Sequence, residues 1–340
     1  MPPTRPKVAG DRDSAPLNEL LKVAFLARNW FMSLLVATVA FGLLLSESLL
    51  PLTEIPGLQT SIVLCVMLMM ALPVPLELVK NAILRPGPAI MASAINMGLL
   101  PLLAYALSQI LPFELAGGLV VAATVPCTLA SAAVWTRKAG GDDTVAIFVT
   151  LITNLSCAFI TPLWLVFLLG QEVQMKFGPM VANLALLVVL PIVIGQLLRF
   201  WNRISTFAHQ HRNSLSVACQ LGILSMVLLG SIQMGHNMVT GVTSTPWTSV
   251  LLVVGLASIA HLLALGCGWY ASHICGIQRP QQIAVALGSS QKTLMIGLKL
   301  AIDCGVSILP MIIYHVSQLL LDAILVERWR KPQPPIQPSE

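Results

Sequence analysis

The sequence predicts an all-α membrane protein with ten transmembrane helices. Hydrophobic residues make up 56% of its 340 residues and charged residues only 10%, whereas soluble domains carry roughly 25% charged residues. Long apolar runs recur along the chain, each close to the roughly 20 residues that one span needs. Lipid cannot satisfy backbone N–H and C=O groups, and the runs are too long for barrel strands. Each run is therefore expected to be a helix.

The ten expected spans follow one another with short connections, five in residues 29–170 and five in residues 179–327. Residues 1–28 read as a flexible cytoplasmic segment without a signal peptide, and residues 328–340 as a disordered cytoplasmic tail. The spans cover 29–46, 58–79, 88–111, 115–138, 143–169, 179–200, 214–237, 247–275, 281–303 and 307–327.

The distribution of basic residues predicts the orientation. All but Lys176, Lys292 and Lys299 of the 19 Lys and Arg residues fall on one side of the ten expected spans. The positive-inside rule makes this side cytoplasmic, so both termini are expected there, with the chain in the plasma or inner membrane. Because the basic residues are spread over six segments, they indicate topology and contact with lipid headgroups, and not nucleic-acid binding.

Two expected spans are interrupted, and both are the fourth of their five-span group. Span 115–138 contains Pro126, which removes a backbone donor and disfavours helical geometry in the residue before it. Span 281–303 contains the polar run 288–293, with Lys292 inside it. If the two groups are inverted repeats, the interruptions meet at the centre of the membrane.

The interruptions are the candidate ion or substrate site. A lysine near the bilayer centre costs roughly 2.5–3.5 kcal/mol on insertion scales, so Lys292 needs a partner, water or a ligand. Broken helices also turn free amides and carbonyls toward a cavity. The alternative is that Pro126 is a tolerated kink and that the small residues only permit close packing. The candidate ligands in the interruptions are Thr128, Ser131, Ser289, Ser290, Gln291, Lys292 and Thr293.

Several segments resemble the bile acid:sodium symporter family. Residues 126–134, 138–142 and 161–162 resemble its fourth and fifth helices, and residues 288–294 and 309–315 resemble its last two. More narrowly, the chain is similar to a branch of sodium-dependent transporters with lysine in the ninth helix. The resemblance implies two inverted five-helix repeats, with spans three to five and eight to ten as a core domain and the others as a panel domain. It also implies that helices four and nine cross at their breaks, with sodium behind the crossing and substrate between the domains.

The sodium ligands of the family carry over only in part. Ser131, Thr150 and Gln291 match polar ligand positions, which makes them candidate sodium ligands, and Asn96 stands where the family has glutamine. Elsewhere the match fails, since Ala132, Ala146, Leu287 and Lys292 replace asparagine, serine, an acidic residue and asparagine.

The exchange of a carboxylate for an ammonium changes the local charge by about two units, which opposes sodium binding. We therefore hypothesise that a sodium site is missing and that Lys292 takes its electrostatic place. Two mechanisms remain open. Lys292 is either a fixed substitute cation in a uniporter or exchanger, or an amine that exchanges protons and makes the proton the coupling ion in place of sodium.

Other polar residues inside the spans have local interpretations. Asn154 lies one helical turn beyond Thr150 and either extends the same ligand row or joins two helices by a hydrogen bond. His261 is expected to be a hydrogen-bonded packing residue. Lys299 and Asp303 are four residues apart and are expected to pair.

His315 and Asp322 share one face of the last span at seven-residue spacing. They either relay protons or pack polar groups at a helix interface. The seven cysteines have no metal-ligand spacing, and no nucleophile, P-loop or dinucleotide motif is present. No cofactor is expected.

The sequence therefore predicts a secondary active transporter of a small organic anion that works by alternating access, and not an enzyme. The alternatives are a transporter-like receptor or sensor that does not transport and, with less support, a membrane-embedded enzyme.

Overall fold

The structure, a computed structural model, describes residues 30–74, 86–129, 131–170, 176–241 and 246–329. Within these ranges every regular element is a helix and none is a strand, which confirms the all-α prediction. The predicted cytoplasmic segment 1–28 and residues 330–340 of the predicted tail lie outside the described residues.

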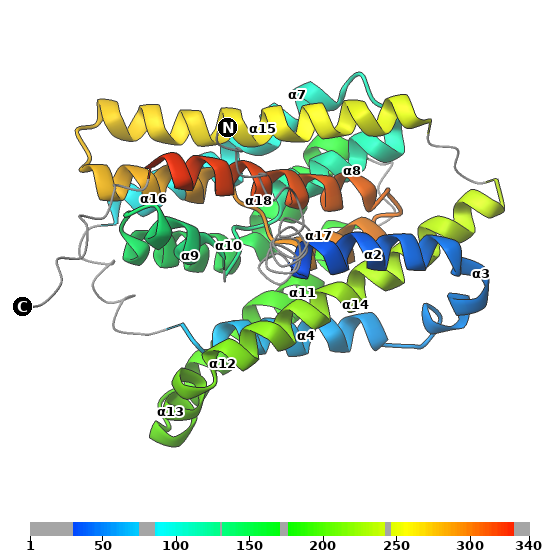
Figure 1. The fold of residues 1–340 in the computed structure, drawn as a ribbon, viewed down its shortest axis with the longest axis horizontal. Helices are drawn as coiled ribbons and strands as arrows, with labels where there is room; N and C mark the ends of the chain where they lie inside the picture. The colour runs from blue at the N-terminus through cyan, green and yellow to red at the C-terminus, as the bar shows by residue number, and fades with distance from the viewer. Residues whose placement is uncertain (1–29, 75–85, 130, 171–175, 242–245, 330–340) are drawn as a thin grey trace, which may run out of the picture.

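In chain order the elements are α2 (Trp30–Leu44), α3 (Ser46–Leu49), η1 (Leu50–Leu52), α4 (Leu58–Ala71), α6 (Gly87–Ala94), η2 (Ile95–Leu99), α7 (Leu100–Ser108), α8 (Phe113–Thr124), α9 (Ser131–Lys138), α10 (Asp143–Leu169), α11 (Phe177–Leu184), η4 (Ala185–Val189), α12 (Leu190–Leu198), α13 (Asn202–Gln210), α14 (Arg212–Val239), α15 (Trp247–Ile274), α16 (Arg279–Ser290), α17 (Leu294–Asp303) and α18 (Leu309–Trp329). Helices α15, α18 and α2 run nearly horizontally in Figure 1, and α14 crosses the view obliquely.

Six helices in the described part of the chain are long and apolar enough to cross a membrane, so this is a multi-pass membrane protein. They are Gly87–Ser108, Asp143–Leu169, Phe177–Leu198, Arg212–Val239, Trp247–Ile274 and Leu309–Trp329. The other four expected spans are bent, short or divided. Residues 30–52 bend by 90° between α2 and α3, and α4 has 14 residues. Spans 115–138 and 281–303 are each two short helices, so the number ten stays a prediction.

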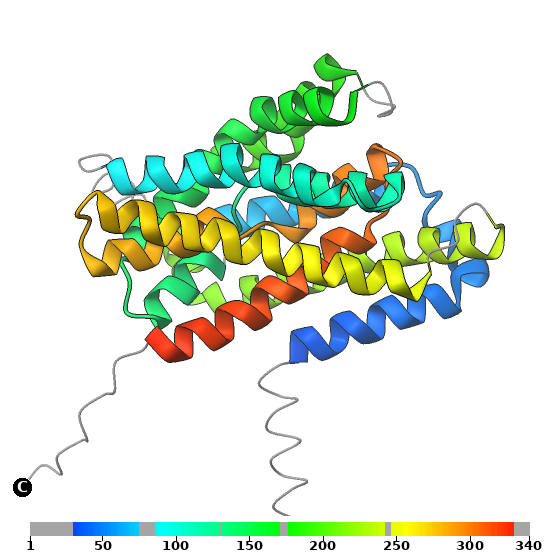
Figure 2. The ribbon, with the colours of Figure 1, turned by 90° about the horizontal axis from the view of Figure 1, so that it is seen from above.

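The helices form two packed groups (Figures 1 and 2). Helices α2, α4, α12 and α14 pack on one another, and α15 packs on α7, α16 and α18 in the other group. Helix α17 contacts both groups, and α10 contacts α16 as well as α11 and η4, which precede α12. Gln196 of α12 and Arg199, directly after α12, donate to Ala71 O and Leu72 O, 2.8 and 2.5 Å away. These bonds satisfy carbonyls at the end of α4 that have no partner within that helix.

A π-helical turn, η2, interrupts the helix that carries Asn96. Its cause is Pro101, which has no N–H. The Leu100 N–H bonds Ile95 O, five residues back. In this register the next donor, for Asn96 O, would be residue 101, but Pro101 has no N–H. In the usual four-residue register residue 101 would donate to Met97 O, which therefore also lacks a backbone donor. Trp164 Nε1 donates to Met97 O at 2.6 Å. The Asn96 carbonyl is left available to another side chain.

The two divided helices contact each other at both ends through reciprocal backbone bonds. Near the start of α8, Glu114 O accepts from Ser307 N, 3.2 Å away in the connection after α17. Near the start of α16, Pro280 O accepts from Asp142 N, 2.8 Å away in the connection after α9. Each divided helix therefore begins where the other ends, and their interruptions fall side by side in the middle.

Candidate ion and substrate site

The first break, residues 125–129, lies between α8 and α9. Pro126 supplies its cause, because the residue before a proline avoids the helical region. Val125 is extended, with φ −69° and ψ 157°. The Cys127 N–H donates to Thr153 Oγ1 at 3.2 Å, and Cys127 O accepts from Asn154 Nδ2 at 2.8 Å. Side chains of α10 thus satisfy the backbone groups that the break frees.

The second break, residues 291–293, lies between α16 and α17 and is shorter than predicted. Gly288, Ser289 and Ser290 still belong to α16, which corrects the expected break over 288–293. Gln291 and Thr293 are extended, with ψ 139° and 127°. The helix continues through Ser290 because small residues are compatible with helical geometry.

The two breaks touch, and we call this contact the crossing. The Thr293 N–H donates to Pro126 O at 3.0 Å, and Lys292 Nζ donates to Val125 O at 2.8 Å. A backbone bond and a side-chain bond therefore join two segments that lie more than 160 residues apart in sequence.

Lys292 is fully buried, and three oxygen atoms surround its amine. Besides Val125 O, the Nζ atom donates to Asn96 O at 2.8 Å and to Asn96 Oδ1 at 2.9 Å. The Asn96 amide cannot turn around, because its Nδ2 donates to Gly288 O at 2.9 Å and to Gln291 O at 3.0 Å. Asn96 O, which Pro101 leaves without a backbone donor, is thus one of the three oxygens around Nζ. The side chain of Asn96 also joins the π-helical turn to the second break and the end of α16.

All three oxygens around Nζ are acceptors only. An ammonium has three N–H groups for them, whereas a neutral amine has two N–H groups and a lone pair. The geometry therefore fits the charged form of Lys292. Backbone and amide oxygens are also the ligands that alkali and alkaline-earth cations take in proteins.

Gln318 of α18 holds the backbone of Lys292. Its Oε1 accepts from the Lys292 N–H at 2.9 Å, and its Nε2 donates to Lys292 O at 3.0 Å and to His315 Nδ1 at 3.0 Å. The sequence analysis missed Gln318. The available signal was an amide on the same helix as His315 and Asp322, three to four residues from each.

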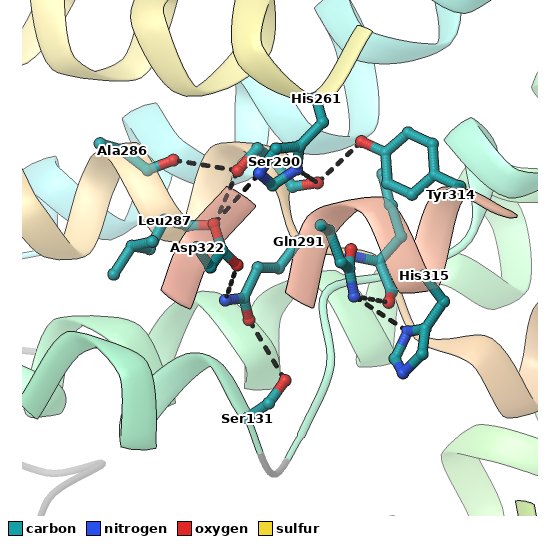
Figure 3. A network of polar contacts seen from close by, with 11 residues as sticks. Ser131, His261, Ala286, Leu287, Ser290, Gln291, Tyr314, His315 and Asp322 are labelled. Carbon is teal, nitrogen blue, oxygen red and sulfur yellow. Dashed lines mark hydrogen bonds and ion pairs between the residues drawn. The ribbon is translucent and has the colours of Figure 1, made fainter. Parts of the chain in front are cut away.

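Figure 3 shows the polar network beside the second break. Asp322 is fully buried and accepts from Gln291 Nε2 at 2.7 Å and lies 3.1 Å from His261 Nε2. Gln291 Oε1 lies 3.4 Å from Ser131 Oγ. His261 is thus hydrogen-bonded in the interior, as predicted. Asp322 bonds Gln291 of the second break and His261 of α15, which agrees with the expected packing of polar groups at a helix interface.

The remaining candidate ligands are held in several ways. Thr150 Oγ1 donates to Ile147 O of its own helix at 2.7 Å, and Asn154 joins α10 to the first break, which is the helix-joining interpretation. Ser290 Oγ lies 3.3 Å from Leu287 O, and its carbonyl accepts from Tyr314 at 2.9 Å. Ser289 packs against Gly268, where a Cβ would lie 2.5 Å from its hydroxyl.

A cavity of about 1060 Å³, its open mouth included, lies between α14, α4 and α2 on one side and the first break, α9, α10 and α18 on the other. Its described lining is mostly apolar and includes no Asp or Glu. Arg212, Ser216 and Gln220 recur every four residues, so they form a polar stripe on one face of α14. The polar lining residues are Thr128, Ser131, Arg212, Ser216, Gln220 and His315.

Several of the family's sodium-ligand positions supply no side-chain oxygen ligand in this chain. Leu287 packs in an apolar cluster with Leu265 and Ile283, and Ala132 and Ala146 pack in another. The three oxygens that bond Lys292 Nζ are backbone or amide oxygens, and none belongs to a carboxylate. The Thr150 hydroxyl donates within its own helix. Lys299 pairs with Asp303, as predicted, and this pair is joined by Asn183 at 3.1 Å, away from the crossing.

Apolar helices of spanning length, paired breaks and a polar centre define a multi-pass membrane transporter. The SBF-like CPA transporter family model matches residues 29–331, so the chain belongs to this family, and the resemblance to bile acid:sodium symporters is confirmed. Its members are transporters and not enzymes.

Curated relatives are similar over part of their length. "Probable sodium/metabolite cotransporter BASS4, chloroplastic" from Arabidopsis thaliana is 26% identical over 239 residues, which are 66% of this chain and 54% of the relative. The protein of the same name from Oryza sativa subsp. indica is 26% identical over 254 residues, 68% of this chain and 59% of the relative. "Sodium/bile acid cotransporter 7" from Xenopus tropicalis is 23% identical over 216 residues, 62% of each chain. The chain thus spans little more than half the length of these relatives.

Proposed function

We propose that this protein is a secondary active transporter of a small organic anion, working by alternating access, in which the Lys292 ammonium stands in place of a coupling sodium ion. The observation that carries the proposal is the set of three acceptor oxygens around Nζ, 2.8 to 2.9 Å away. Such a set satisfies an ammonium as it would a bound cation. The cation is tethered to the chain, so it cannot be taken up or released.

The hydrogen bonds favour the fixed-cation mechanism over proton exchange by Lys292. Loss of a proton from Nζ would leave one acceptor oxygen facing a lone pair in a fully buried position. An unsatisfied buried group of this kind costs about 1–3 kcal/mol. Exchange of one anion for another, without sodium, is therefore the mechanism we propose, because uniport would not be secondary active transport.

We infer a ten-helix architecture of two inverted five-helix repeats with core and panel domains, and with both termini cytoplasmic. The reciprocal bonds from Ser307 to Glu114 and from Asp142 to Pro280 support the inversion, because they relate equivalent ends of α8 and α16. These two helices each have 12 residues. The grouping of α2, α4, α12 and α14 against the other helices supports the two domains.

The cavity between the two helix groups supports an amphipathic anion as substrate. Its apolar lining suits a hydrocarbon body, while Arg212 and the hydroxyl groups are donors for an acidic group. The names of the relatives mention metabolites and bile acids, and both classes include organic acids of this kind.

Uptake into proteoliposomes tests the proposal. The purified full chain would be assayed with labelled taurocholate, monocarboxylates and dicarboxylates, in sodium or choline buffer, with and without a pH gradient. We expect uptake of an anion at the same rate in both buffers, and none by Lys292→Ala. Uptake stimulated by sodium, or wild-type uptake by Lys292→Ala, would contradict the tethered cation. Binding without uptake would instead identify a receptor or sensor.

A further inference from the structure

The Gln318 amide has no rotational freedom, since its two ends are bonded to the N–H and the C=O of one residue, Lys292. Oε1 accepts from the Lys292 N–H and Nε2 donates to Lys292 O. A reversed amide would place oxygen against oxygen and N–H against N–H. Amide orientation, which is often ambiguous, is thus fixed here by the backbone.

This orientation also fixes the protonation of His315. The Gln318 Nε2 atom carries two hydrogens. One goes to Lys292 O, and the other points at His315 Nδ1, 3.0 Å away. The Nδ1 atom must therefore accept, so His315 is the neutral tautomer that carries its proton on Nε2.

His315 Nε2 faces the cavity. His315 lines the cavity and is 7% exposed, and Nε2 has no hydrogen-bond partner among the described residues. Figure 3 shows this nitrogen pointing away from the network that holds the other one. His315 thus presents a donor to a space whose described lining contains no carboxylate.

We propose that His315 donates a hydrogen bond from Nε2 to the transported anion, and that Gln318 is a positioning residue that fixes this tautomer and joins the cavity to the peptide of Lys292. The inference rests on the proposed function, since it names how that substrate is recognised. Because one amide bonds both His315 and the second break, a change at either is transmitted through it. Coupling of this kind is reciprocal, so the position of the break also alters substrate affinity.

The tautomer can be measured without any substrate. We would record 15N spectra of histidine-labelled full chain in nanodiscs, with the four histidines outside the network replaced by Gln at positions 209, 211, 236 and 273. The signals of His315 are assigned by their loss in His315→Gln. We expect an unprotonated Nδ1 and a protonated Nε2. A protonated Nδ1 on His315 would overturn the inference.

Variants of Gln318 separate positioning from packing. Gln318→Glu keeps the size but replaces the donor with an acceptor, so His315 should move its proton to Nδ1. Gln233→Glu, at an exposed position of α14 outside the cavity lining, is the matched control and should leave the His315 spectrum unchanged. An unchanged spectrum in Gln318→Glu would also overturn the positioning role. If Gln318→Glu does not fold, the wild-type spectrum still decides the tautomer.

Ligand binding tests the donor itself, with taurocholate and decanoate as probes and decanol as the uncharged control. A hydrogen bond to a charged group corresponds to about tenfold to a hundredfold in affinity. We expect His315→Leu to lower the affinity for the carboxylate or sulfonate probe by this factor, and His315→Gln to lower it less. The affinity for decanol should not change in either variant. Equal binding by His315→Leu would refute the donor role. If no probe binds the wild-type protein, the substrate class proposed above is contradicted, while the tautomer measurement still stands.

Discussion

The first and second breaks meet at the crossing, but they differ in charge and in contact with the cavity. The first, residues 125–129, has no charged side chain, and Thr128 and Leu129 line the cavity. The second, residues 291–293, carries Lys292 and is almost completely buried. The amides of Asn96 and Gln318 hold the second break, and Asn154 holds the first. The comparison shows that the first break borders the cavity, while the second places a lysine in the interior behind it.

The largest expected effect comes from removing that charge. Lys292→Met keeps an unbranched side chain but leaves three acceptor oxygens without a donor. We expect uptake to fall to background in proteoliposomes, because the tethered cation is lost. Lys299→Met is the matched control, since Lys299 pairs with Asp303 away from the crossing, and it should retain uptake. Equal losses in the two variants would show that the crossing has no special role.

The next effect concerns the support of the second break. Gln318→Ala removes the partners of the Lys292 N–H and C=O, and each unsatisfied buried group costs about 1–3 kcal/mol. We expect a clear fall in the thermal unfolding midpoint, measured in detergent, together with reduced uptake. A wild-type midpoint would indicate that water or a shifted backbone replaces the amide.

Asn154→Ala makes the equivalent change at the first break, with a smaller effect. It leaves Cys127 O without its donor. Only one buried backbone group then lacks a partner, whereas Gln318→Ala affects two, and each such group lowers the stability by about 1–3 kcal/mol. The unfolding midpoint should fall by less than in Gln318→Ala. The reverse order would mean that the first break, and not the second, depends more on its amide support.

The smallest expected effect on stability comes from Pro101→Ala. The new N–H competes for Met97 O and Asn96 O, while the helix gains a residue that favours it. We expect an unfolding midpoint close to that of the wild type, with uptake lowered by up to about tenfold, as for one weakened hydrogen bond to a charged group. Full uptake would show that the π-helical turn is not needed to hold Lys292.

Some of this arrangement could be predicted from the sequence. Pro126 locates the first break because a missing N–H and a steric clash are local properties. The second break was placed too early, since Gly288 and the serines allow either a break or a helix and only the tertiary contacts decide. The exchange of the family's acidic residue for Leu287 is the basis for expecting an incomplete sodium ligand set, and this expectation stays a prediction.

The partners of the buried polar groups could not be predicted in the same way. Asp322 bonds His261 across 61 residues, and no spacing within one helix reveals a partner on another. Gln318 was overlooked because its side chain bonds the backbone N–H and C=O of Lys292, and a sequence does not show which side chain reaches which backbone group. Arg212 was assigned to topology alone, although it lines the cavity.

Sodium-specific stabilisation tests the central claim most directly. A ligand that binds only the folded state raises its stability by an amount set by its concentration and affinity. The unfolding midpoint of the purified wild type would be compared in sodium chloride and in potassium chloride at equal ionic strength. Because the Lys292 ammonium takes the place of the cation, we predict the same midpoint in both salts. A midpoint that rises with sodium concentration, and not with potassium, would contradict the account.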